Sequence, residues 1–153
     1  MVLAMWMGAP LVPSKSKTGI RMIELLQLKK GQTLYDLGSG DGRLLLLAAQ
    51  KGAKAYGVEI NPYALLWSWL RVVLSGKKKN ISLHWRNYWW INLKTADAVV
   101  VYAMPGFMPR LSKKLKKELR PGTLVVSNSF SIPRLKLIKE EIIGKDRIFL
   151  YRI

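Results

Sequence analysis

The sequence predicts an α/β fold: a doubly wound, mostly parallel sheet of seven strands, closed by a C-terminal β-hairpin. The first observation behind this prediction is that short apolar, strand-like runs alternate with helix-like segments, which is typical of parallel βαβ units. The second is that the last two strand-like runs are separated only by the turn Gly144-Lys145-Asp146, as in a hairpin. Right-handed crossovers then place helices on both faces of the sheet.

Length and composition favour one globular domain. The chain has 153 residues, of which 50% are hydrophobic, so it can bury a core without disulfides or metals. Cysteine is absent, which excludes disulfides, thiolate-bound clusters and cysteine nucleophiles. We divide the chain into an apolar leader or anchor remnant at residues 1–13 and a single domain at residues 14–153.

The leader bears on the cellular location. The longest stretch without a charged side chain, residues 1–14, is shorter than the roughly 20 apolar residues of a membrane-spanning helix. It also lacks the basic start of a signal peptide. We therefore expect a cytoplasmic protein, and the leader Met1–Pro13 is a candidate membrane contact.

The first elements follow from the spacing of apolar residues. A helix is expected at residues 18–28, where apolar side chains recur at helical spacing before a Lys-Lys-Gly stop. A short apolar run closed by glycines predicts a buried strand at residues 33–37. The Leu/Ala-rich segment 42–51 predicts the next helix, with Asp41 as its N-cap.

The next strand and helix have clear boundaries. A strand is expected at residues 54–60. Asn61 is then the N-cap of a helix that has Pro62 at its first position and ends at residue 74, before Ser-Gly. A third strand is expected at residues 81–85.

The remaining elements complete the alternation. Three consecutive valines predict a strand at residues 96–103 that is buried on both faces. A helix at residues 108–119 and a strand at residues 123–130 follow, and the hairpin strands are expected at residues 135–143 and 147–153. The lysines of the helix point largely away from its apolar stripe, at Lys113, Lys114, Lys116 and Lys117.

A glycine-rich loop, Asp36-Leu37-Gly38-Ser39-Gly40-Asp41-Gly42, joins the first strand to the following helix. In Rossmann-like sheets ligands bind at the carboxyl ends of the strands, where glycine lets backbone approach the ligand. A phosphate-binding P-loop would require Gly-Lys-Ser/Thr at the helix start, but Gly42-Arg43-Leu44 stands there. A dinucleotide-binding fingerprint would place its third glycine where Arg43 stands. This disfavours hydride transfer from a nicotinamide cofactor without excluding it.

The remaining pattern, Asp-x-Gly-x-Gly-x-Gly, resembles the nucleoside loop of seven-strand methyltransferases that use S-adenosylmethionine. Glu59 supports this interpretation, because it lies 21 residues after Gly38, at the end of the second strand. A carboxylate there can accept hydrogen bonds from both ribose hydroxyls. The alternative is a glycine turn with an unrelated surface glutamate.

A closer resemblance covers most of the chain. It is similar to the small prokaryotic protein-lysine methyltransferases and to their mitochondrial relatives that modify adenine nucleotide translocase and the ATP synthase c-subunit. The resemblance rests on residues 12–14, 36–43, 57–62, 105–108, 113–122 and 125–133. It implies S-adenosylmethionine as cofactor and methyl transfer to lysine ε-amines of proteins.

The resemblance also implies roles for individual residues. The cofactor loop would be formed by Asp36, Gly38, Ser39, Gly40 and Gly42. Glu59 with Ile60 would bind the ribose, and Asn87 with Tyr88 the adenine. Asn87 stands where the family commonly has Asp, so an amide would make the adenine contact.

The chemistry needs a neutral lysine, and its deprotonation costs roughly 4 to 5 kcal/mol at pH 7. The sequence places no carboxylate at the reacting carbon, so we expect a desolvated amine channel without a dedicated base. Tyr102, after the fourth strand, is the candidate catalytic residue, with structural packing as an equal alternative. Candidate substrate-side residues are Pro13, Ser14, Met104 and Pro105, and no metal is expected.

The net charge of +17 leaves two alternatives open. Such a charge attracts RNA, acidic proteins or an anionic membrane surface. An RNA methyltransferase is therefore the second hypothesis, and a basic binding module that keeps the fold without catalysis is the third. The expected partner is a protein substrate, with RNA or an anionic membrane surface on the basic face.

Overall fold

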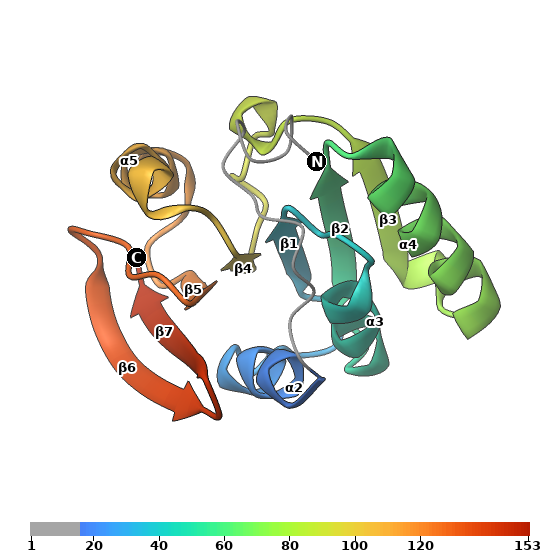
Figure 1. Ribbon diagram of the computed structural model, residues 1–153, viewed down its shortest axis with the longest axis horizontal. Coiled ribbons are helices and arrows are strands. Elements are labelled where there is room, and N and C mark those ends of the chain that lie inside the picture. The colour runs from blue at the N-terminus through green and yellow to red at the C-terminus, as the bar shows by residue number, and fades with distance from the viewer. Residues whose placement is uncertain (1–15) are drawn as a thin grey trace.

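One seven-stranded sheet forms the centre of the molecule in a computed structural model that describes residues 16–153 (Figure 1). The strand order is β3-β2-β1-β4-β5-β7-β6. The pairs from β3 to β5 are parallel, and β7 is antiparallel to both β5 and β6. The strands are β1 (Thr33–Leu37), β2 (Lys54–Glu59), β3 (Ile81–Trp85), β4 (Ala98–Val101), β5 (Leu124–Asn128), β6 (Lys136–Ile143) and β7 (Asp146–Arg152). The predicted fold class is confirmed.

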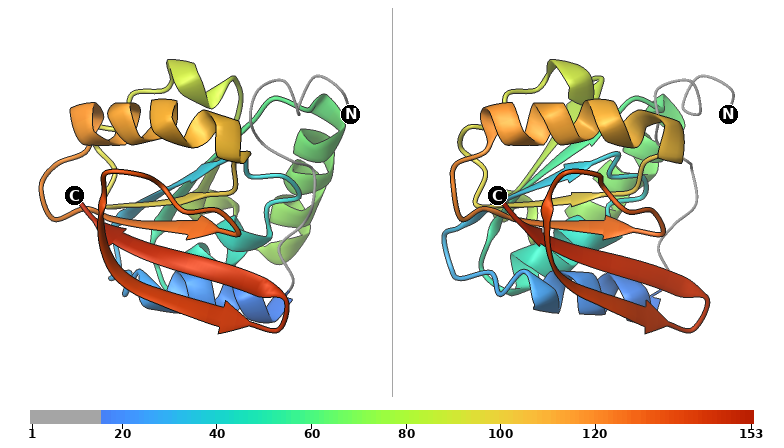
Figure 2. Two further views of the ribbon diagram at one scale, coloured as in Figure 1. Left: turned by 60° about the vertical axis from the view of Figure 1, so that its left-hand side comes forward. Right: turned by 90° about the vertical axis from the view of Figure 1, so that its left-hand side faces the viewer.

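Helices cover both faces of this sheet, as the crossover rule requires. In Figure 2, α5 and α2 lie on opposite sides of the sheet. The helices are α2 (Ser16–Leu25), α3 (Arg43–Gln50), α4 (Pro62–Ser75) and α5 (Met108–Glu118), and short 3-10 turns are η1 (Lys78–Asn80), η2 (Tyr88–Trp90) and η3 (Pro105–Phe107). None of the helices within residues 16–153 is long and apolar enough to cross a membrane.

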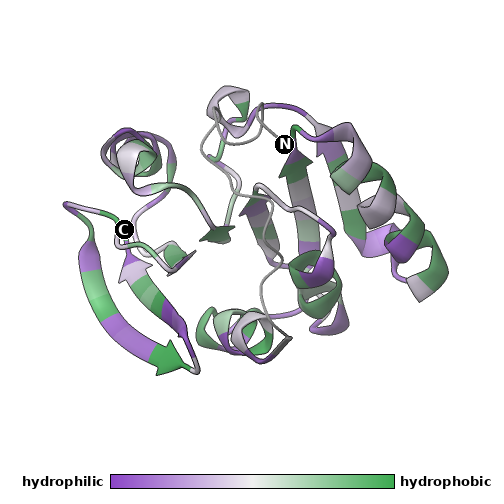
Figure 3. Cartoon of the chain, viewed as in Figure 1, coloured by the Kyte–Doolittle hydropathy of each residue, from purple (hydrophilic) through white to green (hydrophobic). Residues whose placement is uncertain are grey.

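The core consists of two apolar clusters, one on each face of the sheet. Alternate residues of β4 supply both: Val100 joins the cluster under α2 and α3, and Val99 and Val101 join the one under α5. All four residues of β4 are buried, which confirms the central strand that the valine run predicts (Figure 3). The carboxyl ends of β1 and β4 meet where Leu37 pairs with Val101.

Several expected elements extend past the observed ones. Three do so by two or more residues at one end or both, namely the helix at 18–28 and the strands at 96–103 and 123–130. Helix α2 ends at Leu25, because Gln27 adopts a left-handed conformation with φ of 47°. Strand β4 ends at Val101, where its register with β1 and β5 ends, and does not reach residue 103. The leader lies outside the described residues, so the boundary at residue 13 stays a prediction.

One lysine of α5 does not face solvent as predicted. The side chain of Lys114 is only 9% exposed. Its Nζ donates to the Ile91 carbonyl at 2.6 Å and pairs with Glu118 at 2.7 Å. Buried ammonium groups need such partners. Lys114 therefore fixes the segment after η2, whereas the other three lysines of the helix are exposed.

Candidate functional site

The glycine loop turns over the carboxyl end of β2. The N–H groups of Gly38 and Ser39 both donate to the Val58 carbonyl, at 2.9 and 3.0 Å. Gly40 has φ of 54° and Gly42 has φ of 80°, a region that other residues rarely adopt. Within residues 16–153, nothing lies within 4 Å of where a Cβ of Gly40 would stand, so these residues leave the space in front of the loop open to a ligand.

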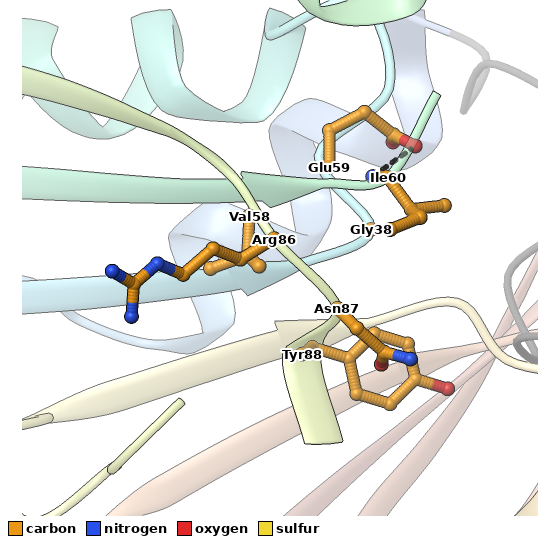
Figure 4. Close-up of a pocket in the computed structure, with 7 residues that line it drawn as sticks. All are labelled: Gly38, Val58, Glu59, Ile60, Arg86, Asn87 and Tyr88. Atoms are coloured by element: carbon orange, nitrogen blue, oxygen red, sulfur yellow. Dashed lines mark hydrogen bonds between the residues drawn. The ribbon is translucent and has the colours of Figure 1, made fainter. Parts of the chain in front are cut away.

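Glu59 holds this loop in place. It is 3% exposed, and its carboxylate accepts three backbone hydrogen bonds. Oε2 accepts from Gly40 N at 2.8 Å, and Oε1 accepts from the N–H groups of Ile60 and Asn61 at 2.9 and 2.8 Å. Figure 4 shows the bond from Ile60. A carboxylate has about four lone-pair directions. About one therefore remains for a ligand, so Glu59 has a structural role that the sequence does not reveal.

Asp36 is buried near the end of β1, and its carboxyl group lacks a hydrogen-bond partner for one oxygen among the described residues. The residue is 4% exposed, and the oxygen without a partner is Oδ2. Burial, and secondarily the charges of Glu59 and Asp41, raise the pKa of Asp36 to about 8. Ser39 Oγ and Tyr88 OH are also buried and unpartnered. Because buried polar groups are nearly always paired, these oxygens indicate a site for a polar ligand.

A pocket of about 220 Å³ opens beside the loop (Figure 4). It brings together five of the predicted cofactor-binding residues, Gly38, Glu59, Ile60, Asn87 and Tyr88. Sequence reasoning missed the two other lining residues, Val58 and Arg86. Val58 directly precedes Glu59, and Arg86 directly precedes Asn87. Their positions next to predicted site residues could have identified them from the sequence.

Asn87 and Tyr88 follow β3 and form the other side of this pocket. The Asn87 Oδ1 accepts from Trp89 N at 3.1 Å and so caps η2. This bond directs the amide oxygen to the backbone and leaves the amide N–H groups as donors. Tyr88 is buried, and burial raises the pKa of its hydroxyl to about 12, so the hydroxyl keeps its proton.

The expected N-cap role of Asp41 is wrong. The N-cap position of α3 is held by Gly42, which has no side chain, so Asp41 lies one residue before it. The Asp41 Oδ1 accepts from the backbone N–H of Arg43 at 3.3 Å, and Oδ2 pairs with Arg43 Nε at 2.7 Å and with Arg71 of α4 at 3.4 Å. A Cβ at Gly42 would overlap Oγ of Ser68, so this glycine lets the loop contact α4 closely.

The catalytic and substrate-side candidates lie after β4. Tyr102 is half-buried and stacks on Phe130 with a centroid separation of 6.2 Å. Met104 precedes η3, and Pro105 begins it and is exposed. None of the three lines the pocket, and Pro13 and Ser14 lie outside the described residues. Residues 16–153 contain no group of three or more His, Asp or Glu side chains that could hold a metal.

Comparisons with known proteins agree on one family. The model of the ANTKMT methyltransferase domain matches residues 36–139. The chain is 34% identical over 125 residues to the ATP synthase c-subunit lysine N-methyltransferase of Mus musculus, covering 82% of this chain and 50% of that protein. It is also 34% identical over 125 residues to a protein-lysine N-methyltransferase of Saccharolobus islandicus, covering 80% and 78%. The chain thus spans about half the length of the first of these relatives.

A solved structure is also similar. It is described as an RNA methyltransferase from Salinibacter ruber in complex with S-adenosyl-L-homocysteine. The TM-score is 0.89 at 29% sequence identity, and the match covers 93% of this chain and 94% of that one.

Asp36 predicts a pH dependence of stability. Its carboxyl stays protonated up to about pH 8 in the folded chain, but only to about pH 4 when unfolded. Unfolding between these values releases a proton, so this group makes the free energy of unfolding fall as pH rises from about 4 to about 8. Denaturant titrations across this range should show the fall in the parent chain and lose it in Asp36→Asn. Asp97→Asn, at a carboxylate paired with Arg120, should keep it. An undiminished slope in Asp36→Asn would contradict the assignment.

Proposed function

This chain belongs to the ANTKMT methyltransferase family, and from that membership we propose that it transfers methyl groups from S-adenosylmethionine to lysine ε-amines of a protein. The observation that carries the proposal is the glycine loop tied to Glu59 beside the unpartnered Asp36. The matched family region, residues 36–139, includes this loop and the whole pocket.

The residues at the loop fit the cofactor. When bound, S-adenosylmethionine supplies a methyl group on a positively charged sulfur. Asp36 is suited to the cationic methionine portion, because its buried carboxylate oxygen lacks a partner. The remaining acceptor capacity of Glu59 suits a ribose hydroxyl, and Asn87 with Tyr88 would hold the adenine. We place the nucleoside against the residues that line the pocket and the rest of the cofactor along the open front of the loop.

Methyl transfer to lysine requires a neutral amine beside the cofactor. Within residues 16–153, eight of the nine acidic side chains already accept a hydrogen bond or ion pair. The ninth is Asp36, which we assign to the cofactor. This supports an acceptor channel without a dedicated base, in which desolvation and neighbouring cations lower the pKa of the incoming lysine. In-line alignment then supplies most of the rate.

The acceptor would enter at the end of β4. Tyr102 and Phe130 form a stacked pair there, at the carboxyl edge that β4 and β5 share with the loop. We propose that the Tyr102 hydroxyl orients the lysine, with Met104 and Pro105 on the substrate side. Pro13 and Ser14 stay predictions of the same kind, as does a cytoplasmic location.

RNA is the alternative substrate, and two observations favour it. The net charge is +17, and the solved relative from Salinibacter ruber is described as an RNA methyltransferase. The protein-lysine relatives match at a higher identity, 34% against 29%, although over a smaller share of this chain, 82% and 80% against 93%. We therefore keep protein lysine as the proposed acceptor.

Gly40→Ala tests the cofactor site, and Gly144→Ala in the hairpin turn is its matched control. Both glycines have positive φ, 54° and 60°, and open space at the Cβ position. Each substitution should cost about 1 kcal/mol of stability through backbone strain. Only Gly40→Ala should weaken binding of S-adenosylhomocysteine, by about tenfold or more, because its methyl occupies the front of the loop. Calorimetric titration measures this, and equal affinities in the two variants would place the cofactor elsewhere.

Tyr102→Phe tests the acceptor side. The change keeps the ring that stacks on Phe130 and removes only the hydroxyl. Methyl transfer should slow by about 10- to 100-fold with unchanged cofactor affinity, because one orienting hydrogen bond is lost. Tyr35→Phe, whose hydroxyl contacts Thr95 at 3.2 Å, should leave the rate unchanged. A full rate in Tyr102→Phe would assign that residue to packing alone.

The reaction itself is tested by transfer of labelled methyl from S-adenosylmethionine into a host lysate. The proposal predicts label that protease releases, ribonuclease does not, and acid hydrolysis recovers as methyllysine. At limiting cofactor, Gly144→Ala should transfer label as the parent does, and Gly40→Ala should transfer clearly less. Label released by ribonuclease would support the RNA alternative. Cofactor binding without any transfer would favour the basic binding module.

A further inference from the structure

Helix α4 presents an apolar surface to solvent. Arg71 is the only charged residue among its 14, and only Ser68 and Val72 are buried. Six of its apolar side chains are at least 40% exposed, namely Leu66, Trp67, Trp69, Leu70, Val73 and Leu74. We call these six residues the α4 face. Figure 3 shows hydrophobic colour on much of α4.

The position of α4 in the fold explains why residues 16–153 leave its outer side uncovered. It packs against β2, β3 and α3, and β3 is the last strand at that edge of the sheet (Figure 1). A helix that needs one buried side carries polar residues on the other, but this one is apolar on both. Trp85, at the end of β3, is also 65% exposed. Contiguous exposed apolar patches indicate a docking surface.

Cations border this surface. Exposed Lys77, Lys78 and Lys79 follow directly after the helix. Arg71 and Arg43 have side chains 41% and 44% exposed. Exposed tryptophan and leucine beside lysine and arginine are typical of helices that lie in the plane of an anionic membrane interface.

The net charge of the chain distinguishes between two possible partners of the α4 face, a second copy of this chain and an anionic membrane. A second copy of this chain would bring another charge of +17 against the same side, which disfavours self-association. A helix of 14 residues cannot span a bilayer, but it can lie at its surface. We propose that the α4 face docks the protein on a membrane surface rich in anionic lipids, with the apolar side chains among the acyl chains and the lysines at the headgroups.

Docking in this way would place the pocket near the membrane. Helix α4 starts at Pro62, three positions after Glu59, so its N-terminal end lies at the carboxyl edge of the sheet. Acceptors held in or on the bilayer would therefore be close to the site. Vesicle binding itself requires no cofactor and no methyl transfer, so the docking proposal stands or falls independently of the proposed activity.

Cosedimentation with vesicles tests the proposal. The full chain should bind vesicles of phosphatidylcholine with phosphatidylglycerol, and should bind pure phosphatidylcholine or high-salt samples far more weakly. The triple variant Trp67→Gln, Leu70→Gln, Leu74→Gln should bind the anionic vesicles about tenfold more weakly than the parent. The control Trp90→Gln, Leu137→Gln, Ile142→Gln changes equally exposed apolar residues elsewhere and should bind as the parent does.

Tryptophan quenching by brominated lipids locates the contact. Anionic vesicles with brominated chains should quench the parent fluorescence. The variant Trp67→Phe, Trp69→Phe should still bind and lose most of the quenching, because its apolar surface remains while the inserted fluorophores are gone. Quenching that persists in this variant would assign the contact to another part of the chain and overturn the proposal.

Two other results would also overturn it. One is parent-like vesicle binding by the triple α4 variant. The other is failure of the parent to bind anionic vesicles while gel filtration shows an oligomer that the triple variant dissolves, since the α4 face would then be an interface between copies.

Discussion

Three backbone hydrogen bonds to one buried carboxylate hold the site together. Glu59 accepts from Gly40 in the glycine loop and from Ile60 and Asn61 at the start of α4. A carboxylate taken out of water is stable only with such donors. The loop, the end of β2 and the first turn of α4 are therefore one unit, and the pocket has its shape because this unit is rigid. A ligand that uses Glu59 meets a group already oriented by the fold.

Asp36 is the second buried carboxyl group at the glycine loop. Glu59 is satisfied by backbone donors, whereas Asp36 is as deeply buried and retains an unpartnered oxygen. Burial disfavours its charge, and a cation beside it would restore that charge. The free protein thus holds one carboxyl in an unfavourable environment at the point where we propose that the cationic cofactor binds. Unfavourable burial of this kind is typical of functional sites.

Helix α4 connects the pocket with the α4 face. The proposed docking gives a role to the exposed apolar side chains of this helix, which the pocket does not use. The helix begins at the pocket, with Asn61 accepting from Tyr63 and Ala64 at its N-cap, and it ends at a lysine run. Its outer side is apolar although the sheet needs only its inner side. The strong positive charge of the chain would weaken contact with lysine-rich segments in solution. A membrane surface removes this difficulty, because it supplies the anionic charge while holding the acceptor.

Much of this molecule follows from local sequence. The alternation of apolar runs determined the seven strands, and the Asn61-Pro62 signal located the start of α4, because these depend on spacing along the chain. The same kind of spacing predicts the candidate cofactor site from the glycine loop and Glu59. Tertiary structure alone decided the rest. The Lys114 side chain is held against the protein by the Ile91 carbonyl, Arg71 of α4 joins the Asp41 carboxylate, and the outer side of α4 is exposed in the described structure because β3 is an edge strand. Each depends on residues distant in sequence, and local patterns do not encode such contacts.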